Sequence, residues 1–133
     1  MKKLVVYSCF FLLISGVLVG YQEYLGVLTG HDIMLVTHMW VGAFFIVLFP
    51  MFVLDHVGLH RKRLKKVSGI SMTGLWMLGS TSGLIISGMV LWTHGDTPIY
   101  EWKLLHLLLT LVCYVGFALH FIVNRDYKGR RSK

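Results

Sequence analysis

The chain has 133 residues, of which 56% are hydrophobic and only 14% are charged, and its formal net charge is +7. A chain of this length builds one compact unit, so we expect a single domain over residues 1–133. A water-soluble domain of this size would not bury so much apolar surface, so the composition excludes that class and predicts a membrane protein.

Four apolar stretches follow one another along the chain, at about residues 4–21, 33–55, 70–92 and 104–123. Each is close to or above the roughly 20 residues that cross a bilayer as a helix. They do not alternate apolar and polar residues as membrane-barrel strands do, so we expect an all-α fold. The short connections predict an up-and-down four-helix bundle, in which the second and fourth helices run parallel, and we expect no internal repeat.

Basic residues concentrate on one side of these stretches. Twelve of the thirteen Lys and Arg lie at Lys2 and Lys3, in residues 61–66 or in residues 125–133. Cytoplasmic segments retain such residues, so we expect both termini and the 57–68 connection in the cytoplasm, with the chain in the inner (cytoplasmic) membrane. Basic clusters beside helix ends attract anionic lipid, so we expect membrane lipid and no nucleic acid as their partner.

Two features of the apolar stretches have more than one interpretation. The first stretch, after Lys2 and Lys3, resembles a signal peptide, but no small-residue cleavage site follows it cleanly, so we expect a retained helix. Cys9 and Cys113 fall in different stretches. We interpret them as packing residues in preference to a disulfide or a metal-binding pair.

Four histidines fall in the second and fourth expected helices, where an ionisable side chain is costly and is a functional candidate. They are His38, His56, His106 and His120. His106 and His120 are 14 residues apart, or about four helical turns and 21 Å. His38 and His56 are 18 residues apart, or about five turns and 27 Å. Each pair therefore shares one face of its helix.

Because these two helices run in the same direction, their histidines pair by depth. His38 should face His106 toward the outer side, and His56 should face His120 toward the inner side. A metal ion held by two histidines alone would be under-coordinated, whereas a haem brings four nitrogens and needs two axial ligands. No CxxCH motif occurs, so the spacing predicts two non-covalent haems b.

The inner pair leaves an alternative open. The interval between histidines in the second helix is about 6 Å longer than in the fourth, and a kink at Pro50 would absorb the difference. His60, one turn beyond His56, is the alternative inner ligand. His56 and His60 would also suit an i, i+4 metal pair, for which no third ligand is evident.

Glycines near the histidines are candidates for cofactor contact. Gly42 lies on the face of His38, where a small residue makes room for a porphyrin ring. Gly83 forms a small-xxx-small pair with Gly79 in the third stretch. That pair predicts either close helix approach or a flat cofactor against the backbone.

Cationic side chains at the helix ends are candidates for haem propionates. Lys103 is three residues before His106 and so shares its face, although a lysine that merely reaches toward the headgroups is the alternative. For the inner haem the candidates are Arg61, Arg63 and Arg125.

This pattern resembles the four-helix di-haem b-type cytochromes of respiratory membranes, including bacterial cytochrome b561 and the cytochrome b subunits of formate dehydrogenase and nickel–iron hydrogenase. The resemblance covers all four helices and rests on His106 and His120, fourteen apart in the last helix, after the Gly-rich stretch 81–88. Those families commonly draw one ligand from the first helix, which here has no histidine. In that respect the chain is more similar to cytochrome b of the bc complexes, where two helices supply all four ligands.

The resemblance implies an electron-transfer subunit of an oxidoreductase complex, carrying electrons across the membrane between a quinone and a partner redox subunit. Candidates for exchanging quinone protons are His31, Asp32, Tyr100 and Glu101 on the outer side and Asp55 and His60 on the inner side. Two alternatives stay open. One is a transition-metal transporter or chaperone that uses the same histidines, and the other is a cofactor-free assembly or scaffold subunit.

Overall fold

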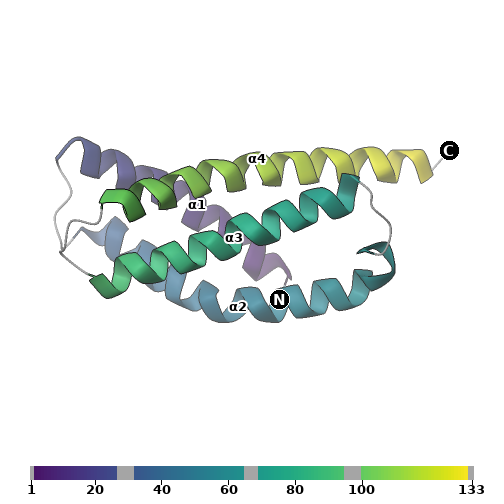
Figure 1. The fold of residues 1–133 in the computed structure, drawn as a ribbon, viewed down its shortest axis with the longest axis horizontal. Coiled ribbons are helices and arrows are strands. Elements are labelled where there is room, and N and C mark those ends of the chain that lie inside the picture. The colour runs from purple at the N-terminus through teal and green to yellow at the C-terminus, as the bar shows by residue number, and fades with distance from the viewer. Residues whose placement is uncertain (1, 27–31, 65–68, 95–99, 132–133) are drawn as a thin grey trace.

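The computed structural model describes residues 2–26, 32–64, 69–94 and 100–131, with side chains except at 60–71 and 124–131. This part of the chain forms four helices: α1 (Lys2–Tyr24), α2 (Ile33–Leu64), α3 (Gly69–His94) and α4 (Tyr100–Arg131) (Figure 1). Each contains a segment of at least 23 residues that is long and apolar enough to cross a membrane. The expected all-helical fold with four membrane-length helices is confirmed.

The helices run past the ends of their apolar stretches. The expected 57–68 connection is wrong in its first part, because α2 continues to Leu64. Residues 56–64 contain no Pro and a single Gly, and Leu, Lys and Arg are good helix formers, so the helix continues past the end of the apolar stretch. α4 likewise continues past its apolar stretch, to Arg131.

Both helix ends at the α1–α2 connection carry caps. Asp32 precedes α2, and its Oδ1 accepts hydrogen bonds from the backbone N–H of Met34 at 2.8 Å and of Leu35 at 3.3 Å. These bonds satisfy N–H groups that the first turn of a helix leaves open. Beyond the end of α1, Gly26 adopts a φ of 67°, the left-handed conformation that glycine provides at low cost.

Packing joins each helix to two others. α3 packs along α4 and α1 along α2, while smaller contacts join α1 to α4 and α2 to α3. Among the described helices, no close backbone approach joins α2 to α4 or α1 to α3. In Figure 1, α2 and α4 accordingly lie at opposite edges with α1 and α3 between them. Any contact between α2 and α4 must be made by side chains.

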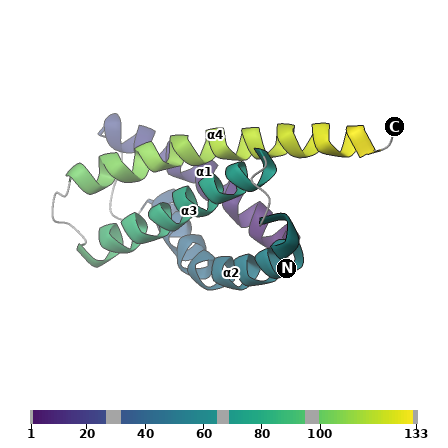
Figure 2. The same ribbon diagram turned by 45° about the vertical axis from the view of Figure 1, so that its right-hand side comes forward.

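α2 is continuous through Pro50, where a kink was expected. The helix spans Ile33–Leu64 with Pro50 in its interior, and the proline side chain is exposed. Proline removes a backbone donor and crowds the preceding turn, which bends a helix without always ending it. Figure 2 shows α2 curving along its length.

The core is small, about half of its buried residues are polar, and many large apolar side chains face outward. Ser15, Ser87 and Cys113 are the largest fully buried side chains, whereas Ile33 is 82% and Phe121 is 66% exposed. A water-soluble protein has the opposite arrangement. Small residues between helices and large apolar residues outside are what lipid surroundings favour.

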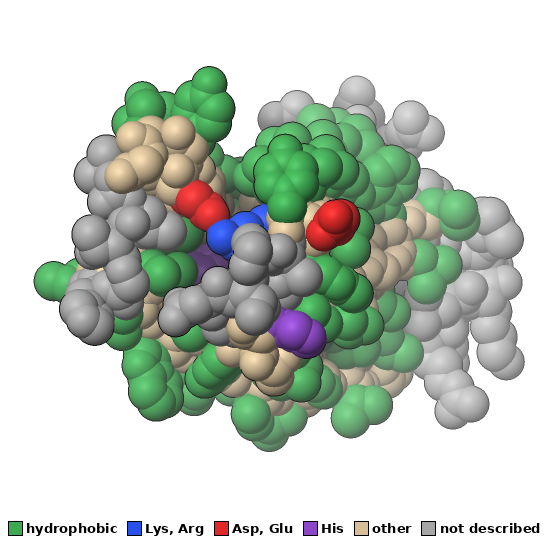
Figure 3. Space-filling model, turned by 60° about the vertical axis from the view of Figure 1, so that its left-hand side comes forward, with side chains coloured by type: hydrophobic (Ala, Val, Ile, Leu, Met, Phe, Trp, Pro, Cys, Tyr) green, Lys and Arg blue, Asp and Glu red, His purple; other side chains and the backbone are tan. Residues whose placement is uncertain are grey.

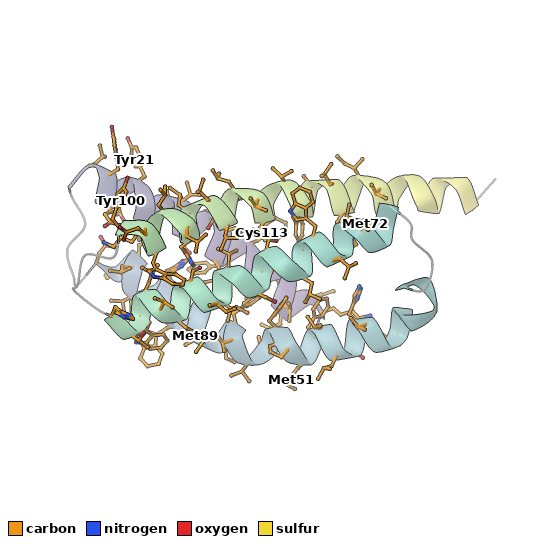
Figure 4. All side chains as sticks on the ribbon, in the orientation of Figure 1. Tyr21, Met51, Met72, Met89, Tyr100 and Cys113 are labelled. Carbon is orange, nitrogen blue, oxygen red and sulfur yellow. The ribbon has the colours of Figure 1, made fainter. Side chains whose placement is uncertain are left out.

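Aromatic side chains gather near the end where α1 finishes and α4 begins. Tyr21 and Tyr100 lie there together (Figure 4), and both are exposed. Close to the same end, Trp40 of α2 and Trp92 of α3 are in edge-to-face contact, with ring centres 6.4 Å apart. Tyr and Trp concentrate where a membrane meets water, which fits an interface at this end.

Candidate functional site

His38 and His106 meet across the space between α2 and α4. Their ring centres are 6.4 Å apart and their planes are almost perpendicular, at 85°. The two rings come from helices whose backbones do not approach each other, so they bridge the molecule from opposite sides. The structure thus brings together the two residues that the sequence paired by depth.

A serine from the preceding helix contacts each of these rings. Ser15 Oγ of α1 lies 2.7 Å from His38 Nδ1, and Ser87 Oγ of α3 lies 2.7 Å from His106 Nδ1. Both serines are almost completely buried, with 2% and 0% of their surface exposed. The nitrogen that each ring uses for this bond is therefore Nδ1, and Nε2 is the other polar atom of the ring.

The residue after each serine is a glycine against which the same ring lies. A Cβ added at Gly16 would be 3.2 Å from Cε1 of His38, and one at Gly88 would be 3.4 Å from Cε1 of His106. Each Ser-Gly pair therefore forms a seat for one imidazole: the serine bonds Nδ1 and the glycine leaves room for the ring edge. Below, "seat" refers to Ser15-Gly16 and Ser87-Gly88.

The two inner histidines differ from each other: His120 lies against a Thr-Gly pair like the two seats, whereas His56 lies against an aromatic ring. Thr73 Oγ1 lies 3.1 Å from His120 Nδ1, and a Cβ at Gly74 would be 4.0 Å from His120 Cε1. His56 stacks on Phe52, with ring centres 5.2 Å apart. The pairing of His56 with His120 stays a prediction. So does the alternative at His60, whose side chain lies outside the described residues.

The faces between the histidines point inward. On α2, Phe45 is buried and stacks on Phe49, with ring centres 5.5 Å apart. On α4, Thr110 and Cys113 are buried, and Thr110 Oγ1 donates to the carbonyl of His106 at 2.9 Å. The helix faces that carry the histidines are thus the faces that the chain buries.

The two candidate glycines lie against neighbouring helices. A Cβ at Gly42 would meet Leu12 of α1 at 3.9 Å, and one at Gly83 would meet Leu109 of α4 at 3.1 Å. At Gly83 the side chain of Leu109 occupies the adjacent space, so α3 and α4 approach closely there. Close helix approach was one of the two interpretations of the Gly79–Gly83 pair. Their contact with a cofactor stays a prediction.

Lys103 forms an ion pair with Glu23, joining the start of α4 to the end of α1. Figure 3 views this end of the molecule and shows acidic and basic side chains together among hydrophobic ones. Both side chains are close to half exposed, so Lys103 lies in a polar rim at this end. The side chains of Arg61, Arg63 and Arg125 lie outside the described residues.

The two cysteines, expected as packing residues on separate helices, lie together. Both are free thiols, and Cys9 lies near enough to Cys113 for the two side chains to interact. Cys113 is fully buried near the middle of the molecule (Figure 4), where Thr81 Oγ1 lies 3.7 Å from its sulfur. This buried polar group occupies the middle of the core.

The polar residues proposed for proton exchange have varied surroundings. Asp32 caps α2, as described above. Tyr100, Glu101 and Asp55 are exposed. His31 and the side chain of His60 lie outside the described residues.

The sequence did not predict the two seats, although both contain the same three-residue motif. Ile14-Ser15-Gly16 in α1 and Ile86-Ser87-Gly88 in α3 are identical, and each lies against a histidine of the following helix. In both the α1–α2 and the α3–α4 pair, the first helix therefore offers the same three residues to a histidine of the second. Three common residues within apolar helices do not stand out until the contacts are known.

The geometry of the outer pair indicates what kind of group it suits. Two imidazoles bound to opposite sides of one metal ion have bonds of about 2.0–2.1 Å and roughly 1.1 Å more to each ring centre, or about 6.3 Å between centres. The observed separation is 6.4 Å. In the part of the chain that the structure describes, no group of three or more His, Cys, Asp or Glu could hold a metal ion. Two opposed imidazoles are the donor set that a haem would use, because a haem brings its own four equatorial nitrogens.

No match to this chain was found among protein-family models, curated proteins or solved structures. The resemblance to di-haem membrane cytochromes therefore rests on the residues themselves and stays a prediction.

Proposed function

We propose that the chain is a membrane b-type cytochrome subunit, a four-helix bundle that carries electrons across the cytoplasmic membrane through two bis-histidine haems b. Both termini lie in the cytoplasm, and the electrons pass between a quinone and a redox partner subunit.

The observation that carries this proposal is the contact of His38 with His106. Their ring centres are 6.4 Å apart, which leaves room for one metal ion between the two rings if each presents Nε2 to it. Ionisable side chains within membrane spans are costly and mark functional sites. A purely structural role would require only a hydrogen bond for each ring, which Ser15 and Ser87 already provide. A purely structural role gives no reason for the two rings to contact each other.

The roles of the remaining residues follow from their positions. His38 and His106 would hold the outer haem, and His56 and His120 the inner one. A bound haem supplies an iron that exchanges single electrons. The protein's contribution is to fix the two ligands from opposite helices and to exclude water with the apolar faces around them.

The basic helix ends support the orientation. The Lys and Arg of residues 61–66 and 125–133 fall at one side of the four spans, with Lys2 and Lys3. Lys103, at the other side, is close to His106 in sequence and is the candidate to pair with a propionate there. Its partner Glu23 would then share the lysine with the cofactor.

The test is a reduced-minus-oxidised absorption spectrum of the full chain purified in detergent, with haem and iron quantified per chain. We expect two low-spin haems b per chain, both extractable by acidic organic solvent. A protein with bound zinc, copper or another transition metal in place of haem would favour the transport alternative. A protein that carries neither would favour the scaffold alternative. Covalently bound haem would also overturn the proposal.

A further inference from the structure

We propose that Ser15 and Ser87 are positioning residues that hold His38 and His106 in the tautomer with hydrogen on Nδ1, so that both present Nε2 to the haem. This inference rests on the proposed function and adds to it how the outer ligands are oriented.

The direction of the hydrogen bonds carries the inference. Each serine hydroxyl has a second contact, to the carbonyl three residues before it: Ser15 Oγ to Leu12 at 3.3 Å and Ser87 Oγ to Leu84 at 3.1 Å. The hydroxyl has one hydrogen, and a carbonyl only accepts. When that hydrogen points to the carbonyl, Oγ accepts from the imidazole. Nδ1 then carries the hydrogen and Nε2 keeps its lone pair.

The burial of the seats makes this arrangement costly to lose. Ser15 and Ser87 are 2% and 0% exposed, so water would not readily replace the serine oxygen. A buried N–H without an acceptor costs about 1–3 kcal/mol. The glycine of each seat touches the Cε1 edge of the ring, which restricts the ring from the other side. Serine and glycine together fix both the tautomer and the ring plane.

A hydrogen-bond acceptor on the far nitrogen also changes the ligand. It makes the imidazole more basic and fixes its orientation, as outer-shell partners do for other metal-binding histidines. A more basic ligand favours the oxidised iron. Both ligands of the outer pair have this support from equally short bonds of 2.7 Å, so the outer haem should be held at a lower potential than it would be without the serines.

The experiment compares the Ser15→Ala and Ser87→Ala variants of the full chain with wild type and with Ser80→Ala. Ser80 is a matched control, because it is buried in α3 and donates to the carbonyl of Met77, three residues before it, at 3.3 Å. Two properties are measured: the midpoint potential of the outer haem, and the rate at which haem transfers to an acceptor apoprotein. The outer haem is the one whose redox wave disappears in His38→Ala.

We expect each seat variant to raise the midpoint potential of the outer haem and to weaken its retention by about 10- to 100-fold. The inner haem and the Ser80→Ala control should be unchanged. Ser15→Thr and Ser87→Thr retain the hydroxyl and should stay close to wild type, since Thr73 makes the equivalent contact to His120 at 3.1 Å. If an alanine variant fails to accumulate, the threonine variant decides, because the inference requires it to keep the wild-type potential.

The inference is overturned if Ser15→Ala and Ser87→Ala leave both properties equal to those of Ser80→Ala. It is also overturned if the threonine variants lose the outer haem as the alanine variants do. In either case wild type would still contain two haems, and the proposed function would stand. A wild-type protein without haem would instead contradict the proposed function itself.

Discussion

A methyl group at residue 88 would meet the imidazole of His106. The added Cβ of Gly88→Ala lies 3.4 Å from His106 Cε1, so the ring or the helix must move by a few tenths of an ångström. Alanine is the better helix former by about 1 kcal/mol, so the helix itself is not weakened. We expect a changed low-spin electron paramagnetic resonance signal and lower occupancy of the outer haem. Gly79→Ala is the control, since nothing lies within 4 Å of its Cβ, and identical spectra for the two variants would contradict the seat geometry.

The ion pair between Lys103 and Glu23 offers a second test at the residue scale. Both side chains are nearly half exposed, so the pair contributes less than about 1 kcal/mol and its loss should barely change thermal stability. If the proposed outer haem is present, the two charges should change its midpoint potential. Lys103→Met removes a positive charge and should lower its midpoint potential, whereas Glu23→Gln removes a negative charge and should raise it. Redox titration of both variants checks the two signs, and wild-type potentials in both would remove Lys103 from the site.

Close packing of α3 on α4 gives a prediction at the scale of the elements. A Cβ at Gly83 would lie 3.1 Å from Leu109 Cδ1, so Gly83→Val overpacks this contact and should destabilise the protein by about 1–3 kcal/mol. Gly79→Val is the control on the same helix. The double variant Gly83→Val/Leu109→Ala should recover part of the loss, because the two positions share one space. Unfolding in mixed detergent measures this, and equal stability of Gly83→Val and Gly79→Val would contradict the packing.

How much of each element was predictable depends on the physical signal behind it. The four helices follow from apolar runs long enough to cross a bilayer, and that signal needs no neighbour. The helix ends do not follow from the apolar runs. α2 continues to Leu64 through residues that form helix as readily in water as in lipid. Which helices pack most closely depends on where small residues allow approach, as at Gly83, and many small residues compete for that role.

The outer and inner histidine pairs also differ in how far the sequence could predict them. The juxtaposition of His38 and His106 required only that α2 and α4 run parallel and that both residues lie near one end. The inner pair depends also on how α2 curves beyond Pro50, which sequence does not specify, so His56 and His60 remain alternatives there. The serine seats depend on the register between neighbouring helices and became visible only from contacts.

The orientation of the whole molecule is testable with reporter fusions. The positions of Lys and Arg predict both termini in the cytoplasm. Green fluorescent protein fused after Lys133 should fluoresce, and alkaline phosphatase at the same position should be inactive. Phosphatase inserted in the 95–99 connection should be active. A strongly active phosphatase at the C-terminus would invert the molecule and exchange its outer and inner sites.

At the scale of the whole molecule, the central claim is that α2 and α4 each supply one ligand to the same haem. The most direct measurement is redox titration of wild type, His38→Ala, His106→Ala and the double variant, with His94→Ala as a control histidine exposed at the end of α3. The account predicts that both single variants lose the same one of two redox waves, that the double variant resembles either of them, and that His94→Ala retains both. Loss of different waves in His38→Ala and His106→Ala, or a wild-type titration in both, would contradict it.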